Sequence, residues 1–241
     1  MTTVFRVEID WNHDGTWTDE TPYTRHIWIR SGFERPGDLV AGVGRCRLTL
    51  DNTSRRFSPG AAGSPLYGRL LPRRAVRVRA FDGAESWTLF RGVIERITPQ
   101  AGAWCGGEVT LEAVDGIALL ARQSISLSYA SSQPVDAVVA AVVSAAYTPP
   151  AADYHANGDT LAHVGRAWPP EQTSALDALR TICAAVHGRF FVARDGTAVF
   201  LTRADLQRSQ RSPVPVVGAE GATLNSERRA GLEIPGPAFP K

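Results

Sequence analysis

The sequence predicts a β-rich α+β protein in which a strand-dominated N-terminal part precedes a smaller part with two helices. Up to about residue 120, apolar and polar residues alternate with a period of two, which is typical of half-buried strands. Helical spacing of apolar residues occurs only after that point. A hydrophobic content of 44% and a charged content of 21% are those of a globular chain with a sizeable core.

Residues 1–120 are predicted to form a β-barrel or a β-sandwich. The alternation is clearest where Cys46, Leu48 and Leu50 face one way and arginine or threonine faces the other. Turn-forming residues such as Asp14-Gly15 separate the predicted strands. These strands are expected at residues 3–10, 24–30, 44–50, 75–80, 87–99 and 108–113.

A long connection at about residues 51–74 joins two of these strands. It is rich in Gly, Pro and Ser, and it far exceeds the roughly two to five residues of a tight hairpin. Long ordered loops are usually functional, so we predict a projecting arm that buries apolar side chains against a neighbouring protein. The residues expected at this interface are Arg55, Arg56, Phe57, Leu66, Tyr67 and Leu70.

Residues 121–204 are predicted to form a mixed α+β domain of two helices and a hairpin. Ser132 is the expected cap of the first helix, and Pro134 fits its first turn. Five valines between residues 135 and 143 supply one apolar face.

The second predicted helix begins at Thr173 or Ser174, and Gly188 stands where a C-cap glycine belongs. The segments RFFVA and TAVFLTR, joined by RDG, predict the hairpin. Residues 205–241 are polar and then rich in Pro and Gly, so an extended C-terminal tail is expected there.

Overall composition excludes few partners but suggests a compartment. The net charge of +2 is too small to imply nucleic-acid or membrane binding by itself. Cys46, Cys105 and Cys183 form no C-x-x-C pair, as expected of a protein folded in a reducing cytoplasm. No apolar run has the length of a membrane span, and the N-terminus lacks a signal-peptide pattern. A soluble protein made inside a cell is expected.

Asp10, Asn12, Asp14 and Gly15 match the start of a calcium-binding loop, in which alternate oxygens converge on one ion. The twelfth position of that loop is Thr21 rather than the bidentate glutamate, and no helices flank it. A hairpin turn stabilised by aspartate side chains explains the same residues without a metal. We prefer the turn, and no cofactor is expected.

Four arginines, Arg45, Arg47, Arg77 and Arg79, are predicted on one sheet face. That face could border a channel through which DNA passes. Cross-strand pairing with Glu95, Glu108 and Glu112 is the simpler interpretation, and it is preferred. No motif for specific nucleic-acid binding accompanies these residues.

The remaining candidate sites are weak, so no enzyme is expected. Asp153, His155, Asp159 and His163 share one irregular loop, for which polarity is a simpler explanation than metal binding. The sequence contains no H-E-x-x-H, G-x-S-x-G or P-loop motif.

The succession of segments resembles the baseplate-hub, or tail-tip, proteins of tailed bacteriophages. The likeness lies in VEIDWNHDGTWTDET, in RCRLTLDNTSRRFSPG followed by SPLYGRLLP, in LFRGVIERITP and in EVTLEAVDGIALL. The segment SALDALRTICAAVHGRFFVARDGTAVFLTR continues it, so that most of residues 3–203 are covered in the expected order.

This resemblance implies a β-barrel related to the tail-tube fold, followed by a mixed domain, in a ring that is usually trimeric. Such a hub ends the tail tube of the virion and is assembled in the host cytoplasm. Its expected partners are distal-tail, tape-measure and tip or fibre proteins, and DNA would pass without specific binding. Many relatives continue into further domains, whereas this chain stops at Lys241, so a compact hub is expected.

Two alternatives remain open from the sequence. The chain could be a distal-tail ring protein of the same assembly. It could instead be a carbohydrate-binding or wall-degrading module at the tail tip. The six tryptophans are spread along the chain, and core or interface packing explains them better than a sugar-binding platform.

Overall fold

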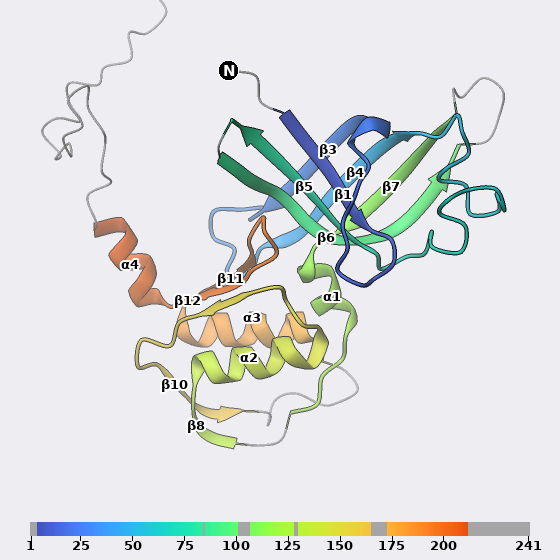
Figure 1. The fold of residues 1–241 in the computed structure, drawn as a ribbon. Helices are drawn as coiled ribbons and strands as arrows, with labels where there is room; N and C mark the ends of the chain where they lie inside the picture. The colour runs from blue at the N-terminus through green and yellow to red at the C-terminus, as the bar shows by residue number, and fades with distance from the viewer. Residues whose placement is uncertain (1–3, 84, 101–106, 128–129, 165–172, 212–241) are drawn as a thin grey trace, which may run out of the picture.

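The computed structural model describes residues 4–83, 85–100, 107–127, 130–164 and 173–211. A curled seven-stranded sheet lies beside a helical layer with two small sheets (Figure 1). The large sheet contains β1 (Val4–Asp10), β2 (Thr18–Asp19), β3 (Thr24–Gly32), β4 (Gly42–Asp51), β5 (Ala75–Asp82), β6 (Glu85–Pro99) and β7 (Glu108–Val114). The six strands predicted from the alternating pattern are therefore confirmed.

The strands of the large sheet are antiparallel in the order β2-β1-β5-β6-β7-β4-β3. In β4, Cys46, Leu48 and Leu50 are buried and the arginines between them are exposed, as the alternation predicts. The order begins with β2 and ends with β3, so the sheet has two edges. The strands that the structure describes do not close into a barrel, so the barrel part of the prediction stays unconfirmed.

One hydrophobic core fills the inside of the curled sheet. Val7, Ile9, Val78 and Leu111 are fully buried there, contributed by strands β1, β5 and β7. Because successive residues of a strand face opposite sides, each strand sends every second side chain into this core. Trp11 and Phe57, which follow β1 and β4, complete it at one end of the sheet.

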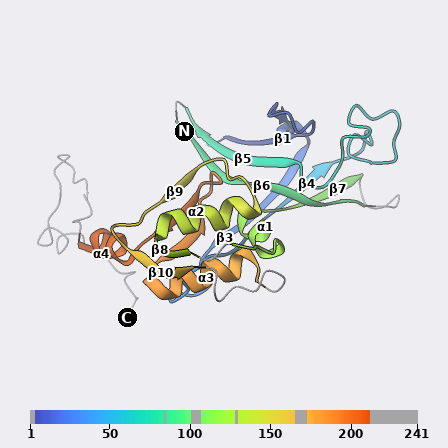
Figure 2. The same ribbon diagram turned by 90° about the horizontal axis from the view of Figure 1, so that it is seen from below.

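The second part packs its own core between helices and small sheets. Its elements are α1 (Gly116–Arg122), β8 (Ala130–Pro134), α2 (Val135–Ala146), β9 (Ala152–Tyr154), β10 (Thr160–Val164), α3 (Ala175–Val186), β11 (Arg189–Val192), β12 (Ala198–Leu201) and α4 (Arg203–Arg211). The short helix η1 (Thr21–Tyr23) precedes β3 and belongs with the large sheet. Helices α2 and α3 pack against each other, as the view from below shows (Figure 2). The two predicted helices and the β11–β12 hairpin are confirmed.

The ends of these helices correct two sequence predictions. Ser174 caps α3, as predicted, by accepting a hydrogen bond from the Asp177 N–H. Ser132 lies in β8 instead, and α2 follows Pro134, which has extended backbone. The left-handed residue after α3 is His187 rather than Gly188. A side chain at 188 would collide with the Leu201 carbonyl oxygen, which explains the glycine.

Two further helices were not predicted. Helix α1 begins directly after β7, where the Asp115 carboxylate caps it by accepting a hydrogen bond from the Ile117 N–H. Helix α4 occupies Arg203–Arg211, so the expected extended tail is wrong for residues 205–211. The rest of that predicted tail, and Cys105, lie outside the described residues.

The two layers are joined by backbone pairing as well as by chain connection. The Ala41 N–H donates to the Phe190 carbonyl, and the Phe190 N–H donates to the Leu39 carbonyl, both at 2.9 Å. Val40 and Val43, which precede and begin β4, also pack against the helical core. None of the described helices is long and apolar enough to span a membrane.

Candidate functional site

The predicted arm folds back onto its own chain. Phe57, Leu66 and Leu70 are only 0%, 4% and 6% exposed, and all three belong to the core of the large sheet. Phe57 packs against Trp11 and Tyr23, with ring centroids 6.2 and 5.6 Å apart. The prediction that these three residues anchor a partner is therefore wrong. They close one end of the curled sheet instead.

Arg56 also has its partner within the chain. Its guanidinium binds both carboxylate oxygens of Glu20, at 2.8 and 3.1 Å, and Glu20 accepts a third hydrogen bond from Trp11 Nε1 at 2.8 Å. The Glu20 side chain is fully buried, and only 17% of Arg56 is exposed. Among the predicted interface residues, Arg55 and Tyr67 are the two whose side chains are exposed. For those two, an interface role stays a prediction.

The segment proposed as a calcium loop forms a side-chain-stabilised turn. The buried Asp10 carboxylate accepts hydrogen bonds from the N–H groups of Asp14 and Gly15, at 3.2 and 2.9 Å. Asp14 accepts one from the Thr16 N–H at 2.8 Å, which lowers the pKa of the Asp14 carboxyl. The preferred turn is thus confirmed, and Asn12 is exposed beside it. Calcium binding there stays an alternative.

Three of the four arginines predicted on one face of the sheet form ion pairs, largely with partners other than those expected, and Arg45 has none among the described residues. Arg47 pairs with Glu112 at 3.0 Å, as predicted. Arg77 and Arg79 both bind Glu8 at 2.8 Å, because β5 pairs with β1. Desolvation opposes these arginine contacts, and the net effect is a lowered pKa for Glu8.

The polar loop around His155 is organised by ion pairs. His155 lies 3.1 Å from both Asp153 and Asp205. Asp159 and His163 belong to other parts of the fold, before and within β10. No group of three potential metal ligands occurs among residues 4–83, 85–100, 107–127, 130–164 and 173–211.

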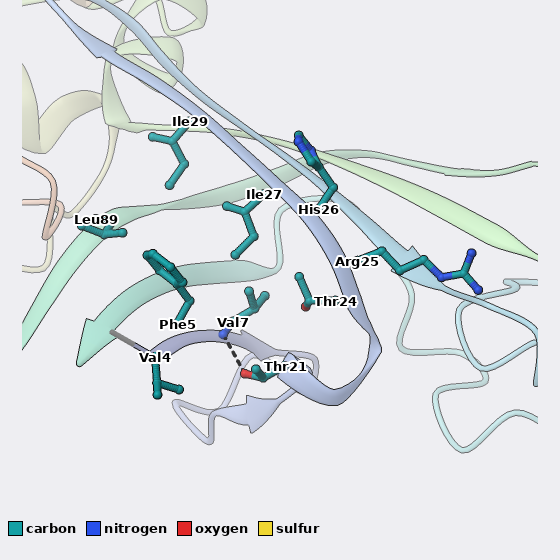
Figure 3. Close-up of a pocket in the computed structure, with 10 residues that line it drawn as sticks. All are labelled: Val4, Phe5, Val7, Thr21, Thr24, Arg25, His26, Ile27, Ile29 and Leu89. Atoms are coloured by element: carbon teal, nitrogen blue, oxygen red, sulfur yellow. Dashed lines mark hydrogen bonds between the residues drawn. The ribbon is translucent and has the colours of Figure 1, made fainter. Parts of the chain in front are cut away.

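The site that sequence reasoning missed is a groove between β1 and β3, at the open side of the curled large sheet. It has a volume of about 650 Å³ and runs between β1 and β3, with a contribution from β6. Ile27 and Ile29 of β3 point across it toward Phe5 of β1 and Leu89 of β6 (Figure 3). Arg25 and His26 point away from this apolar group. We call this feature the seam groove.

A bulge in the sheet helps to form the seam groove. Val78 of β5 pairs with Phe90, but the next residue pairs with Thr88, so Leu89 is an extra residue in β6. A bulge bends a strand and redirects its side chains, and Leu89 accordingly lines the groove. Phe5 keeps 46% of its surface exposed because no described strand covers that side of β1.

The edges of the seam groove differ along its length. At one end the Val7 N–H donates to Thr21 Oγ1 at 3.0 Å, and the Glu20 N–H donates to the Val7 carbonyl at 2.8 Å (Figure 3). Toward the other end, Val4–Arg6 pair with β5 on one side only, and neither their opposite side nor the outer edge of β3 pairs with a described strand. The groove thus offers apolar side chains and free backbone donors and acceptors together. Such a surface suits a strand or extended segment.

Arg25 fixes the start of β3 at the rim of the seam groove. Its guanidinium binds Asp51 of β4 and Glu108 of β7, both at 2.8 Å. Hydrogen bonds to these two carboxylates raise the pKa of Arg25. The ion pairs hold β3 to its own sheet and so fix the position of this edge.

The architecture is one that tail proteins have. The 43 kDa tail protein of prophage MuSo2 from Shewanella oneidensis has a TM-score of 0.53 at 13% identity, covering 82% of this chain and 52% of that protein. The tail protein from Neisseria meningitidis MC58 has a TM-score of 0.57 at 15% identity, covering 83% of this chain and 50% of that protein. No family model and no curated protein sequence matches the chain. The β-rich fold with helices that the resemblance implied is found in these tail proteins, whereas its barrel is not confirmed. The chain spans about half the length of the two proteins.

Proposed function

We propose that the chain is a structural subunit of a phage tail tip, a hub ring of three copies that ends the tail tube. The supporting observation is a tail-protein fold whose large sheet leaves an apolar seam groove between two unpaired edges. Exposed sheet edges with apolar neighbours favour pairing with another chain. In the proposed ring, an extended segment of a neighbouring tail subunit covers the groove.

The proposed position is the virion tail tip, with distal-tail, tape-measure and peripheral tip or fibre proteins as neighbours. The role is mechanical and needs no catalytic group or cofactor. Isolated cell walls incubated with the pure protein should therefore release no soluble fragments. Release of sugar or peptide fragments would favour the wall-degrading alternative.

The groove is tested by placing a charge in it without touching the core. Phe5→Asp puts a carboxylate on an exposed position of the seam groove, so the fold is kept while a docked apolar segment is disfavoured. Leu71→Asp is the matched control, since Leu71 is 49% exposed and lies in the loop that closes the other end of the sheet. The readout is incorporation of each variant into tails, together with the mass of the purified protein in solution.

Loss of incorporation for Phe5→Asp, with normal incorporation of Leu71→Asp, supports the proposal. The reverse pattern places the interface at the loop and contradicts a role for the groove. A reconstruction of the particle gives the symmetry at this chain's position. Three copies at the end of the tube are expected, whereas a sixfold ring above it would identify a distal-tail protein.

A further inference from the structure

A second hollow lies between the large sheet and the helical layer. Its volume is about 500 Å³, and Arg91 of β6, Tyr147 after α2, and the loop residues His13 and Arg73 line it, together with the buried Asp115, whose pKa burial raises to about 7. None of these residues takes part in the seam groove. The hollow is therefore a separate site from the seam groove. We call it the junction pocket.

Arg91 is half-buried and forms no salt bridge among the described residues, although the Asp195 carboxylate is close enough to interact with its charge. In the strand register it stands directly opposite Arg77, another arginine. Like charges in this position destabilise a sheet. The nearby carboxylate of Glu8 is already bound by Arg77 and Arg79. The outer face of β5 and β6 therefore has an excess of positive charge beside the junction pocket.

The Arg91 guanidinium lies beside an aromatic ring. It lies 5.7 Å from the centroid of the Trp17 ring, and Arg77 lies 4.2 Å from the same centroid. Burial and the charge of Arg77 lower the pKa of Arg91, and the Asp195 carboxylate only partly opposes them. A planar guanidinium presents a fork of N–H donors that matches a carboxylate.

Tyr147 supplies an independent sign of a missing partner. Its hydroxyl is buried, and it is the one buried side-chain polar atom in the described part of the chain without a hydrogen bond. Buried hydroxyl groups in native proteins nearly always have a partner. The hydroxyl packs against Gly116, where an added Cβ would lie 2.1 Å from it. Glycine at position 116 therefore leaves the space that the Tyr147 hydroxyl occupies.

The rim of the junction pocket is also strained. His13 and Arg73 have φ angles of 61° and 67°, in the left-handed region that non-glycine residues seldom adopt. Strained residues of this kind gather at binding sites, where the rest of the fold holds them in place. Both of them line this one pocket.

We propose that the junction pocket binds a carboxylate group, with the Arg91 guanidinium as the main donor and the Tyr147 hydroxyl as a second. The carboxylate could belong to a free small dicarboxylic acid or to an acidic side chain of a partner protein. Both sources have the same chemistry, and the experiment separates them.

The test is a titration followed by NMR of the whole chain, with succinate as the probe and sodium chloride at equal ionic strength as the reference. Saturable shifts of the Trp17 indole and the Gly92 and Gly116 amides are expected. Arg91→Gln should weaken binding about tenfold or more, since a charged hydrogen-bond donor is lost. Arg45→Gln is the matched control, because Arg45 is an exposed strand arginine without an ion pair among the described residues, and it should leave the affinity unchanged.

Tyr147→Phe separates binding from folding. Its hydroxyl has no partner to lose, so thermal stability should be kept or increased while succinate affinity falls severalfold. Tighter binding of a short glutamate-containing peptide than of succinate assigns the carboxylate to a partner protein, and the reverse order assigns it to a free acid. Absence of saturable shifts in the wild type, an unchanged affinity in Arg91→Gln, or tighter binding of inorganic phosphate would overturn the proposal.

Discussion

Replacing Arg56 with alanine tests whether the loop after β4 is part of the core or an outward arm. Arg56 is the counter-ion of Glu20, whose carboxylate is fully buried and also holds the indole N–H of Trp11. The guanidinium further lies 5.0 Å from the Tyr23 ring and 5.7 Å from the Phe57 ring. Alanine would leave Glu20 charged and buried with one of its three hydrogen bonds.

The size of the effect follows from this burial. Removing one partner of a buried ion pair typically costs about 3–5 kcal/mol of unfolding free energy. Because 17% of the Arg56 side chain is exposed, water can reach part of the site, and we expect about 3 kcal/mol. With a denaturant dependence of about 3 kcal/mol per molar urea, the unfolding midpoint would fall by about 1 M.

Urea unfolding followed by tryptophan fluorescence measures this loss. Arg69→Ala is the control, since Arg69 is exposed in the same loop and has no ion pair within the described residues. The double variant Arg56→Ala with Glu20→Gln removes both charges, so it should be more stable than Arg56→Ala alone. If Arg56→Ala loses no more than Arg69→Ala, or if the two changes at 56 and 20 simply add, the buried-pair reasoning fails.

Two further predictions concern pH. Burial raises the pKa of Asp115 from 3.8 to about 7. The protonated carboxyl therefore adds to the free energy of unfolding, fully below about pH 4, and this addition is lost as the pH rises through 7. Between pH 4 and pH 8 the unfolding free energy of the wild type should therefore fall relative to that of Asp115→Asn, by at most about 4 kcal/mol. Urea unfolding measures this, and parallel pH profiles for the two proteins would contradict the prediction. The hydrogen bonds of His155 with Asp205 and Asp153 raise the pKa of that imidazole, so its stabilising effect is present below its unfolded pKa and is lost as the pH rises through the folded value. Urea unfolding of His155→Gln should show a larger deficit against wild type at pH 5 than at pH 9, and an equal deficit at both would exclude the ion pairs as the cause.

The sheet could be predicted from the sequence because its strands carry their own pattern. Cys46, Leu48 and Leu50 alternate with polar residues, and burial on one face follows directly from that spacing. The spacing of residues within a strand does not show which glutamate each arginine pairs with. Arg77 and Arg79 bind Glu8 because β5 pairs with β1, which is a long-range feature with no local signal.

The loop was misread because its composition was given more weight than its apolar residues. Gly, Pro and Ser predict irregular backbone, and the backbone is irregular. Phe57, Leu66 and Leu70 have no periodic spacing, yet they are core residues, because a curled sheet must be closed at its end by something apolar. A large aromatic residue within an otherwise polar loop was the available signal.

The seam groove and the junction pocket could not be found from the sequence at all. The groove depends on β1 and β3 approaching without pairing, and on an extra residue in β6. The pocket depends on Arg91 and Tyr147, which lie in separate layers of the fold, lining one hollow. Each feature is set by how the elements pack.

The ladder that links Leu39 and Ala41 to Phe190 has a consequence for how the chain loses its structure. The side chains of Val40 and Ile117 pack in the helical core, although both residues adjoin strands of the large sheet in the chain. Unfolding of either layer therefore exposes apolar surface of the other. Thermal melting is then expected to be a single cooperative transition. A fragment cut near residue 120 would expose apolar valine and isoleucine side chains, so we expect it to aggregate rather than to fold independently.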